Sequence, residues 1–171
     1  MPENLILVDQ NDNQIGTGEK MEVHLNGDLH RAISVFVFDS TSQLLLQKRA
    51  NTKYHSPGLW ANTCCTHPYP DETVEQAAHR RLKEEMGFDC DLSEAFSFIY
   101  KVTLQNNLIE HEYDHVLIGT FDGQPQLNPA EVQTFKWIAI PDLQTDLLAH
   151  PDQYVEWLKI CFEKLVYHLP H

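Results

Sequence analysis

The 171-residue sequence predicts a single α+β domain in which helices flank a mixed β-sheet. Segments rich in β-branched and aromatic residues alternate with turn residues, a pattern typical of strands. Apolar residues at helical spacing mark two further segments, one in the middle of the chain and one at its end. Because no repeat, linker or low-complexity tract separates these segments, we expect one domain over residues 1–171.

The strand signals begin at Leu5 to Val8, which precede turn residues at 10–13 and two glycines, Gly16 and Gly18. Residues 32–38 and 43–47 flank a short polar turn, so they have the pattern of a hairpin. Three later strands are expected at Phe96 to Thr103, Glu112 to Thr120 and Phe135 to Ile140.

Two helices are expected. Asp71 can cap a helix that runs from about Glu72 to Met86, and Gly87 can end it as the left-handed residue after the last turn. The last segment, Pro151 to His168, repeats apolar residues at helical spacing, so we expect an amphipathic helix that lies on the sheet.

Composition limits the function classes. The formal net charge of −13 disfavours binding to nucleic acid or to an anionic membrane, because both are polyanions. No apolar run approaches the ~20 residues needed to cross a bilayer. The N-terminus lacks the pattern of a secretory signal, so we expect a cytoplasmic protein whose four cysteines are reduced. An anionic substrate would need local cations and bound metal to overcome the overall negative field.

The segment from Asn62 to Pro68 places a thiol and an imidazole two residues apart. Side chains alternate along an extended segment, so Cys65 and His67 should face one space while Cys64 points away. The pattern therefore selects Cys65 over its neighbour as the functional thiol.

The expected helix before Gly87 carries charged residues at the spacing of the Nudix box. Seven of the nine specified positions match: Glu72, Arg80, Leu82, Glu84, Glu85, Gly87 and Phe88. Thr66 stands where the box has its Gly, and Arg81 stands where it has Glu after the Arg. At 100° per residue Arg81 lies on the helix face of Glu84 and Glu85, so a cation stands beside the carboxylates that would hold a metal. This departure weakens the prediction of a hydrolase.

Together with other motifs, the altered box resembles the type 1 isopentenyl-diphosphate isomerases, a family of Nudix fold, over most of the chain. The motifs are Lys20-x-x-x-His24, Leu29-His30-Arg31-Ala32, Lys48-Arg49-Ala50, Pro57-Gly58-Leu59-Trp60, Asn62-x-x-Cys65-x-His67-Pro68, Arg80-Arg81 and Glu110-x-Glu112. The resemblance implies interconversion of isopentenyl diphosphate and dimethylallyl diphosphate by protonation and deprotonation through a tertiary carbocation. It assigns these proton transfers to Cys65 and Glu112, on opposite faces of the substrate.

The same resemblance implies two metal sites. One divalent ion, Mn²⁺, Zn²⁺ or Mg²⁺, would be held by His24, His30, His67, Glu110 and Glu112. A magnesium ion would bridge Glu85 and the substrate diphosphate. The residue chemistry agrees in part, because imidazole with carboxylate suits borderline cations and Mg²⁺ commonly binds one or two carboxylates together with phosphate. The other histidines are expected to be polar surface: His55, His79, His111, His115, His150, His168 and His171.

The resemblance also implies the residues that bind the rest of the substrate. Lys20, Arg49, Lys53 and Arg81 would bind the diphosphate, and Tyr100 and Trp157 would shelter the carbocation with their aromatic faces. For Trp157, simple packing of the last helix is a serious alternative. The expected partner is a small isoprenoid diphosphate, with neither nucleic acid nor membrane, and the oligomeric state stays open.

Two other functions remain to be weighed. The first is a Nudix hydrolase of a nucleoside diphosphate derivative, in which Glu84 and Glu85 bind magnesium and activate water. The second is a metal-binding or interaction module on the same fold that has no catalytic activity.

Overall fold

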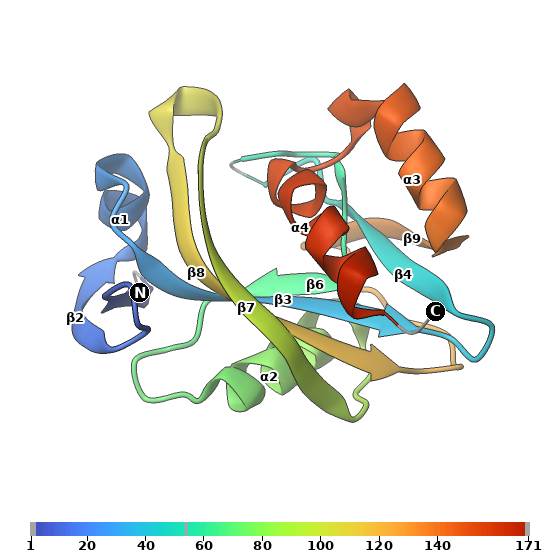
Figure 1. The fold of residues 1–171 in the computed structure, drawn as a ribbon, viewed down its shortest axis with the longest axis horizontal. Coiled ribbons are helices and arrows are strands. Elements are labelled where there is room, and N and C mark those ends of the chain that lie inside the picture. The colour runs from blue at the N-terminus through green and yellow to red at the C-terminus, as the bar shows by residue number, and fades with distance from the viewer. Residues whose placement is uncertain (1–2, 54, 170–171) are drawn as a thin grey trace.

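The computed structural model describes residues 3–53 and 55–169, which form one nine-stranded mixed sheet flanked by helices (Figure 1). The predicted α+β class is therefore confirmed. The strands are β1 (Asn4–Val8), β2 (Gln14–Glu19), β3 (His30–Phe38), β4 (Gln43–Arg49), β5 (Trp60–Ala61), β6 (Cys64–Thr66), β7 (Leu92–Thr103), β8 (Ile109–Thr120) and β9 (Val132–Ala139). The helices are α1 (Lys20–Asn26), α2 (Val74–Met86), α3 (Ile140–Ala149) and α4 (Glu156–His168), with short 3₁₀ turns at Gln105–Asn107 (η1) and Pro151–Gln153 (η2).

Strand β3 is the centre of the sheet. It pairs in parallel with β8 along its whole length, from His30 opposite Glu112 to Phe38 opposite Thr120. Its other edge meets β1, β6 and β4 in turn, all antiparallel. The predicted hairpin of residues 32–38 and 43–47 is therefore only partly correct. Between β3 and β4 only Phe38 and Leu44 are paired, because β4 pairs with β9 along its length instead.

The sheet separates two apolar clusters. Along β3, Ile33, Val35 and Val37 point toward α2, whereas Phe36 and Phe38 point toward α4, as the period of two requires. Figure 1 shows α2 on one side of the sheet and α3 and α4 on the other. This arrangement leaves the end of β3 near His30 for polar side chains.

Helix α2 has both of its ends marked by local sequence. Its cap is Thr73, whose side chain accepts from the backbone N–H of Gln76, while the side chain of Gln76 accepts from Thr73. The prediction that Asp71 caps a helix from Glu72 is wrong by two residues, because the carboxylate of Glu72 instead accepts from Tyr69 and Arg80. Gly87 ends the helix with φ of 71°, as predicted.

Several elements differ from the sequence prediction. Gly16 and Gly18 lie in β2 rather than in a turn, and Ile140 begins α3 instead of ending a strand. The last segment is a 3₁₀ turn followed by α4, because Val155 leaves the helical path and donates its backbone N–H to the carbonyl of Trp60 at 3.0 Å. Helix α1 was not expected.

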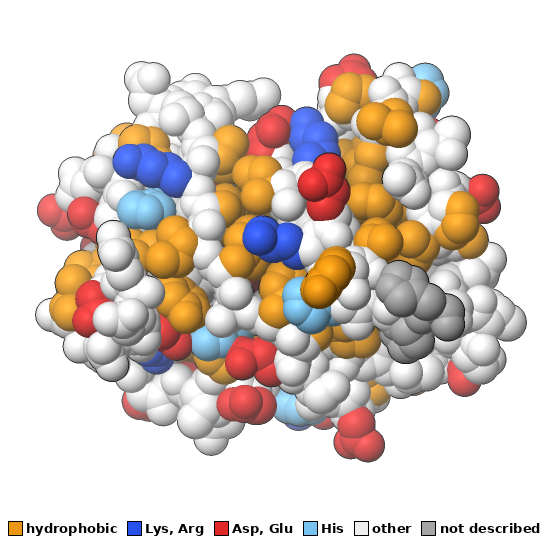
Figure 2. Space-filling model, in the orientation of Figure 1, with side chains coloured by type: hydrophobic (Ala, Val, Ile, Leu, Met, Phe, Trp, Pro, Cys, Tyr) orange, Lys and Arg blue, Asp and Glu red, His pale blue; other side chains and the backbone are white. Residues whose placement is uncertain are grey.

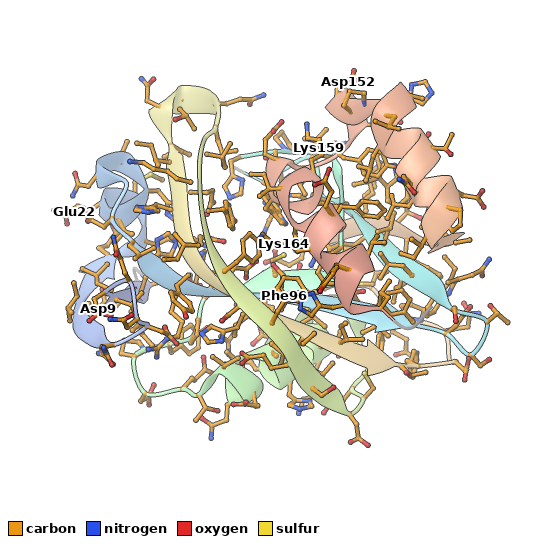
Figure 3. The ribbon with its side chains drawn as sticks, viewed as in Figure 1. Asp9, Glu22, Phe96, Asp152, Lys159 and Lys164 are labelled. Atoms are coloured by element: carbon orange, nitrogen blue, oxygen red, sulfur yellow. The ribbon has the colours of Figure 1, made fainter. Side chains whose placement is uncertain are left out.

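Helix α4 lies against β7. Figure 3 shows Phe96 of β7 beside Lys164 of α4, and Figure 2 shows hydrophobic side chains gathered where these elements meet. Phe96 stacks on His168 with ring centroids 4.4 Å apart, and the ammonium of Lys164 lies 5.6 Å from the ring centroid of Phe98. These contacts set the position of α4 and so of Trp157 in its first turn. No helix in the described part of the chain is long and apolar enough to span a membrane.

Candidate active site and metal centre

One pocket collects nearly all of the predicted site residues. It is lined by Lys20, Arg49, Lys53, Cys65, His67, Arg81, Glu85, Tyr100, Glu110, Glu112 and Trp157, with His55, Asn62 and Gln47 among them. The remaining two predicted residues, His24 and His30, lie buried directly behind Glu110 and Glu112. The structure therefore brings the predicted residues together from eight helices and strands and from the two loops that hold Lys53 and His67.

Three histidines and two glutamates form a compact cluster at one end of the pocket. His24 comes from α1, His30 from the start of β3, His67 from the segment after β6, and Glu110 and Glu112 from one face of β8. Each residue offers one ligand atom, and these atoms all lie within 4.8 Å of one another. The His67 Nε2 is 3.0 Å from Glu112 Oε2, and the His24 Nε2 is 3.3 Å from Glu110 Oε1.

The hydrogen bonds of two histidines prepare them to bind a metal. The Nδ1 of His24 lies 2.7 Å from the carbonyl of Lys20, and the Nδ1 of His30 lies 2.9 Å from the carbonyl of Asp28. Because a carbonyl only accepts, Nδ1 must carry the hydrogen, which leaves a lone pair on each Nε2. Within the described residues, both Nε2 atoms and Oε2 of Glu110 are buried without a hydrogen-bond partner. A group of buried acceptor atoms that lack hydrogen-bond partners and lie close together fits a divalent cation.

Electrostatics act on the members of this cluster in different directions. Burial lowers the pKa of His24, but the nearby carboxylate of Glu110 outweighs burial and raises that pKa overall. Burial, followed by the charge of His30, lowers the pKa of His67 well below its ordinary value, so the imidazole stays neutral. Burial raises the pKa of Glu112, but its interactions with Glu110, His30 and Tyr100 outweigh burial and lower that pKa overall. The resting carboxyl of Glu112 is therefore ionised.

Cys65 and Cys64 lie on opposite sides of β6, as predicted. Cys65 faces the pocket, where its Sγ is 3.3 Å from Asn62 Oδ1 and 3.7 Å from Ser34 Oγ. Cys64 is packed in the apolar cluster under α2. Burial raises the pKa of the Cys65 thiol, so the resting group is protonated. All four cysteines are free.

Three polar residues around Cys65 were not predicted. Asn62 Oδ1 also accepts from the indole N–H of Trp157 at 3.2 Å, so one amide contacts both the thiol and the aromatic ring. Ser34 donates to Asp114 Oδ2 at 2.7 Å, and both residues are buried. The alternation Glu110-x-Glu112-x-Asp114 was the available signal for Asp114, because these three side chains share one face of β8.

The two predicted aromatic residues both reach the pocket. Tyr100 lies opposite Glu112 in the β7–β8 register, and its hydroxyl donates a short hydrogen bond to Glu112 Oε1. Trp157 is 6% exposed and packs in the apolar cluster of α4 as well as lining the pocket. Trp157 therefore both packs in the apolar cluster and lines the pocket.

The other end of the pocket is rich in cations. The guanidinium of Arg81 is 3.0 Å from Glu84, 3.2 Å from Glu85 and 2.8 Å from Glu131. Lys53 also pairs with Glu131. Glu85 is buried, and burial raises the pKa of its carboxyl even though the charge of Arg81 opposes this. Arg81 thus stands among the carboxylates that the intact Nudix box would offer to a metal.

Two histidines contradict the prediction that they are polar surface. His55 is buried in the pocket, packs edge-on against Trp157 at 5.9 Å, and has its pKa lowered to about 3 by burial and by Arg49. His115 is buried between Asp12 and Glu94. Their sequence spacing matched no motif, so only the folded chain distinguishes them. His79, His111, His150 and His168 are at least partly exposed, and His171 lies outside the described residues.

Solved structures with this fold support the architecture. A protein from Deinococcus radiodurans, DR0079, superposes with a TM-score of 0.72 at 21% identity, covering 86% of this chain and 90% of that one. A MutT protein from Methanosarcina mazei superposes with a TM-score of 0.66 at 16% identity, covering 81% and 94% of the two chains. At these identities the similarity shows the fold alone.

Sequence comparison is more specific. The NUDIX domain family matches residues 28–158. "Isopentenyl-diphosphate Delta-isomerase 2" of Photorhabdus laumondii is 54% identical over 167 residues, covering 98% of this chain and 94% of the relative. "Isopentenyl-diphosphate Delta-isomerase 2" of Aromatoleum aromaticum is 52% identical over 166 residues, covering 97% and 88%. The chain therefore has a NUDIX domain and belongs to the family of isopentenyl-diphosphate Delta-isomerases.

Proposed function

We propose that this protein interconverts isopentenyl diphosphate and dimethylallyl diphosphate, with Cys65 and Glu112 as the two groups that exchange protons with the substrate. The observation that carries the proposal is that both side chains line one pocket beside the His₃Glu₂ cluster. The isomerase names of relatives at about half identity support the same reaction.

The proposed reaction is a balanced exchange of two protons. The protonated carboxyl of Glu112 donates to the terminal methylene, and the alkene electrons form the new C–H bond and leave a tertiary carbocation. The Cys65 thiolate then removes a proton two carbons away, and the electrons of that C–H bond form the new double bond. At the end Glu112 is ionised and Cys65 is a thiol.

The resting site matches that final state. The pKa of Glu112 is lowered and the pKa of Cys65 is raised, so the carboxyl is ionised and the sulfur is protonated. This pair is ready to run the reaction from dimethylallyl diphosphate. For the opposite direction, one proton must return from Cys65 to Glu112. Because the thiol contacts Asn62 and Ser34, and the carboxyl contacts Tyr100, polar groups adjoin both ends of that transfer.

The pocket walls suit a short-lived carbocation. Tyr100 and Trp157 are both buried, and a desolvated cation–π contact contributes about 2 kcal/mol. Burial also keeps water away from the cation, which prevents its capture as an alcohol. Neutral His55, packed against Trp157, adds no competing positive charge.

His24, His30, His67, Glu110 and Glu112 would hold one Mn²⁺, Zn²⁺ or Mg²⁺ ion through their imidazole nitrogens and carboxylate oxygens. A bound divalent cation would neutralise Glu110 and Glu112 and orient the Glu112 carboxyl toward the substrate. Lys20, Arg49, Lys53 and Arg81 would bind the diphosphate, and Glu85 would take a magnesium ion together with it. These local charges offset the formal net charge of −13.

An assay with labelled isopentenyl diphosphate tests the proposal. Protein loaded with a divalent metal should form labelled dimethylallyl diphosphate, and Cys65→Ala and Glu112→Gln should each reduce the rate by about 1,000-fold or more. Cys90→Ala is the matched control, because Cys90 lies outside the pocket and should leave the rate unchanged. Failure of the metal-loaded wild type to form the product would refute the proposal.

The hydrolase alternative is disfavoured by Arg81. Its guanidinium already pairs with Glu84 and Glu85, the two carboxylates that would bind the activating metal. A hydrolase would release phosphate or nucleotide from a nucleoside diphosphate derivative, and this release would survive Cys65→Ala. The same protein samples can be tested for that release.

A further inference from the structure

Glu131 links the two cations at the far end of the pocket. It lies just before β9, and neither the Nudix box nor the isomerase motifs include it. A single carboxylate oxygen, Oε2, accepts from both the ammonium of Lys53 and the guanidinium of Arg81, the latter at 2.8 Å. The Glu131 side chain is 24% exposed, so it is partly withdrawn from water. Charge-assisted bonds at such a site are stronger than those of a fully exposed pair.

The backbone around Glu131 is anchored to the same two regions that carry the cations. The carbonyl of Glu131 accepts from the N–H of Ala50 at 3.0 Å, three residues before Lys53. The N–H of Glu131 donates to the carbonyl of Asn128, and Asn128 in turn donates to the carbonyl of Glu85 on the helix that carries Arg81. The backbone of Glu131 is therefore held in place independently of Lys53 and Arg81.

The carboxylate of Glu131 lies between Lys53 and Arg81 and offsets their mutual repulsion. Two positive charges repel each other, and a lysine has a flexible stem that loses rotamer freedom when its ammonium is fixed. Burial raises the pKa of Glu131, but the bonds and charges of Lys53 and Arg81 outweigh it and lower that pKa. Glu131 is thus ionised. Its negative charge offsets both the repulsion between the two cations and the loss of rotamer freedom in the Lys53 side chain.

We propose that Glu131 is a positioning residue for diphosphate binding, which holds Lys53 and Arg81 with their N–H groups converging on one point. The inference rests on the proposed function, since it assumes that these cations bind the substrate diphosphate. A phosphate oxygen would need N–H donors from both Lys53 and Arg81 directed at it, as they are directed at Glu131 Oε2 in this structure. Glu131 keeps the donors together while no substrate is bound.

Removing the Glu131 carboxylate should change the affinity for diphosphate in opposite directions, depending on whether Glu131 positions the cations or acts only as a negative charge. As a bare negative charge near the diphosphate, Glu131 would repel it, so removing the carboxylate would tighten binding. As a positioning residue it favours binding through Lys53 and Arg81, so removal should weaken binding. The conservative change Glu131→Gln keeps an amide oxygen that can accept from both cations, whereas Glu131→Ala removes the acceptor.

The test measures KM for isopentenyl diphosphate, kcat, and the dissociation constant of inorganic pyrophosphate by calorimetry, with the metal-loaded full chain. Glu131→Ala should raise KM and the pyrophosphate constant about fivefold or more, with kcat changed less than KM. Glu131→Gln should recover most of the lost affinity. In a Lys53→Ala background the effect of Glu131→Ala should shrink, because the residue acts through Lys53. Asp89→Ala is the matched control: Asp89 pairs with His79 and Lys83 outside this pocket, so both constants should be unchanged.

Two results would overturn the inference. One is an unchanged or smaller KM and pyrophosphate constant in Glu131→Ala while the thermal midpoint of unfolding stays at the wild-type value. The other is an undiminished effect of Glu131→Ala in the Lys53→Ala background. Failure of the proposed function has a different signature, because wild-type protein would then form no dimethylallyl product at all.

Discussion

The two ends of the pocket balance their carboxylates in different ways. In the histidine end, formed by His24, His30, His67, Glu110 and Glu112, neutral imidazoles face the carboxylates, and buried acceptor atoms lack partners within the described residues. In the arginine end, formed by Lys53, Arg81, Glu84, Glu85 and Glu131, permanent cations already pair with every carboxylate. The carboxylates of the second end therefore have cationic partners within the chain, whereas buried acceptor atoms of the first end do not.

This difference shows how one domain can hold two kinds of positive charge for two tasks. A divalent ion at the histidine end would concentrate charge near Glu112, the residue proposed to exchange protons. Guanidinium and ammonium groups instead present several hydrogen-bond donors, which suit the oxygens of a diphosphate. On the proposed function, Arg81 in place of the box Glu would separate the binding of the diphosphate from the metal site of the histidine end.

Among the tests that compare the two ends, removing metal should have the largest effect. Dialysis against a chelator should lower isomerase activity about 100-fold or more, because buried acceptor atoms of the histidine end then have no cation to bind among the described residues. Adding Mn²⁺, Zn²⁺ or Mg²⁺ back should restore activity. Metal content measured by elemental analysis should follow the rate. Full activity in protein shown to be free of metal would remove the contrast between the two ends.

Changing Arg81 should affect the other end alone. Arg81→Ala should raise KM for isopentenyl diphosphate by about 10- to 100-fold, since it deletes a multi-donor cation and leaves Glu84, Glu85 and Glu131 without it. Arg81→Lys should recover only part of the loss. Elemental analysis should still find the metal of the histidine end in both variants. Loss of that metal from Arg81→Ala would show that the two ends are not independent.

The neutral imidazoles predict a pH dependence of stability in metal-free protein. The pKa of His55 falls from 6.5 to about 3 on folding, so it stabilises the folded state above pH 6.5 and this stability is lost as pH falls. For such a group the free energy of unfolding falls by about 1.4 kcal/mol for each pH unit between its unfolded and folded pKa values. His67 acts in the same direction, whereas His24, whose pKa is raised, acts in the opposite direction.

Urea unfolding at about pH 7.5, 6.5, 5.5 and 5.0 measures this dependence, because this pH range includes the ordinary pKa of an imidazole. The free energy of unfolding of wild type should fall more steeply below pH 6.5 than that of His55→Gln, which has no imidazole at this position. Equal slopes in the two proteins would show that His55 becomes protonated without cost in the folded state.

The smallest effect concerns the helix that carries the arginine end. Thr73→Ala removes the side-chain acceptor of the capping box on α2, so the free energy of unfolding should fall by about 1 kcal/mol. Thr73→Ser should keep most of it. Because Arg81 and Glu85 lie well inside α2, KM should change little in either variant. A large rise in KM with unchanged stability would indicate that the cap, rather than the helix body, positions Arg81.

Local chemistry explains which features could be predicted from the chain. The alternation of side chains places Cys65 and His67 together and Glu110 with Glu112, and this holds in the folded protein. Gly87 ends α2 as expected, because only glycine readily adopts its φ of 71°, and a Cβ there would lie 2.3 Å from the carbonyl of Gln126. The N-cap of α2 is Thr73 rather than the predicted Asp71, because several neighbouring polar residues could have capped the helix.

By itself, the sequence determined the fold class and the family, because periodicity and motif spacing are local properties of the chain, and the resemblance to that family then supplied the candidate site residues. Only the tertiary structure decided which distant groups share a space. It brings Glu131 between Lys53 and Arg81, Asn62 between Cys65 and Trp157, and His55 into the pocket. These contacts depend on the pairing of β3 with β8 and β6 and on the seating of α4, which join residues far apart in the chain. Burial raises the pKa of Cys65, whereas neighbouring side chains outweigh burial and lower the pKa of Glu112, and both effects exist only in the folded protein.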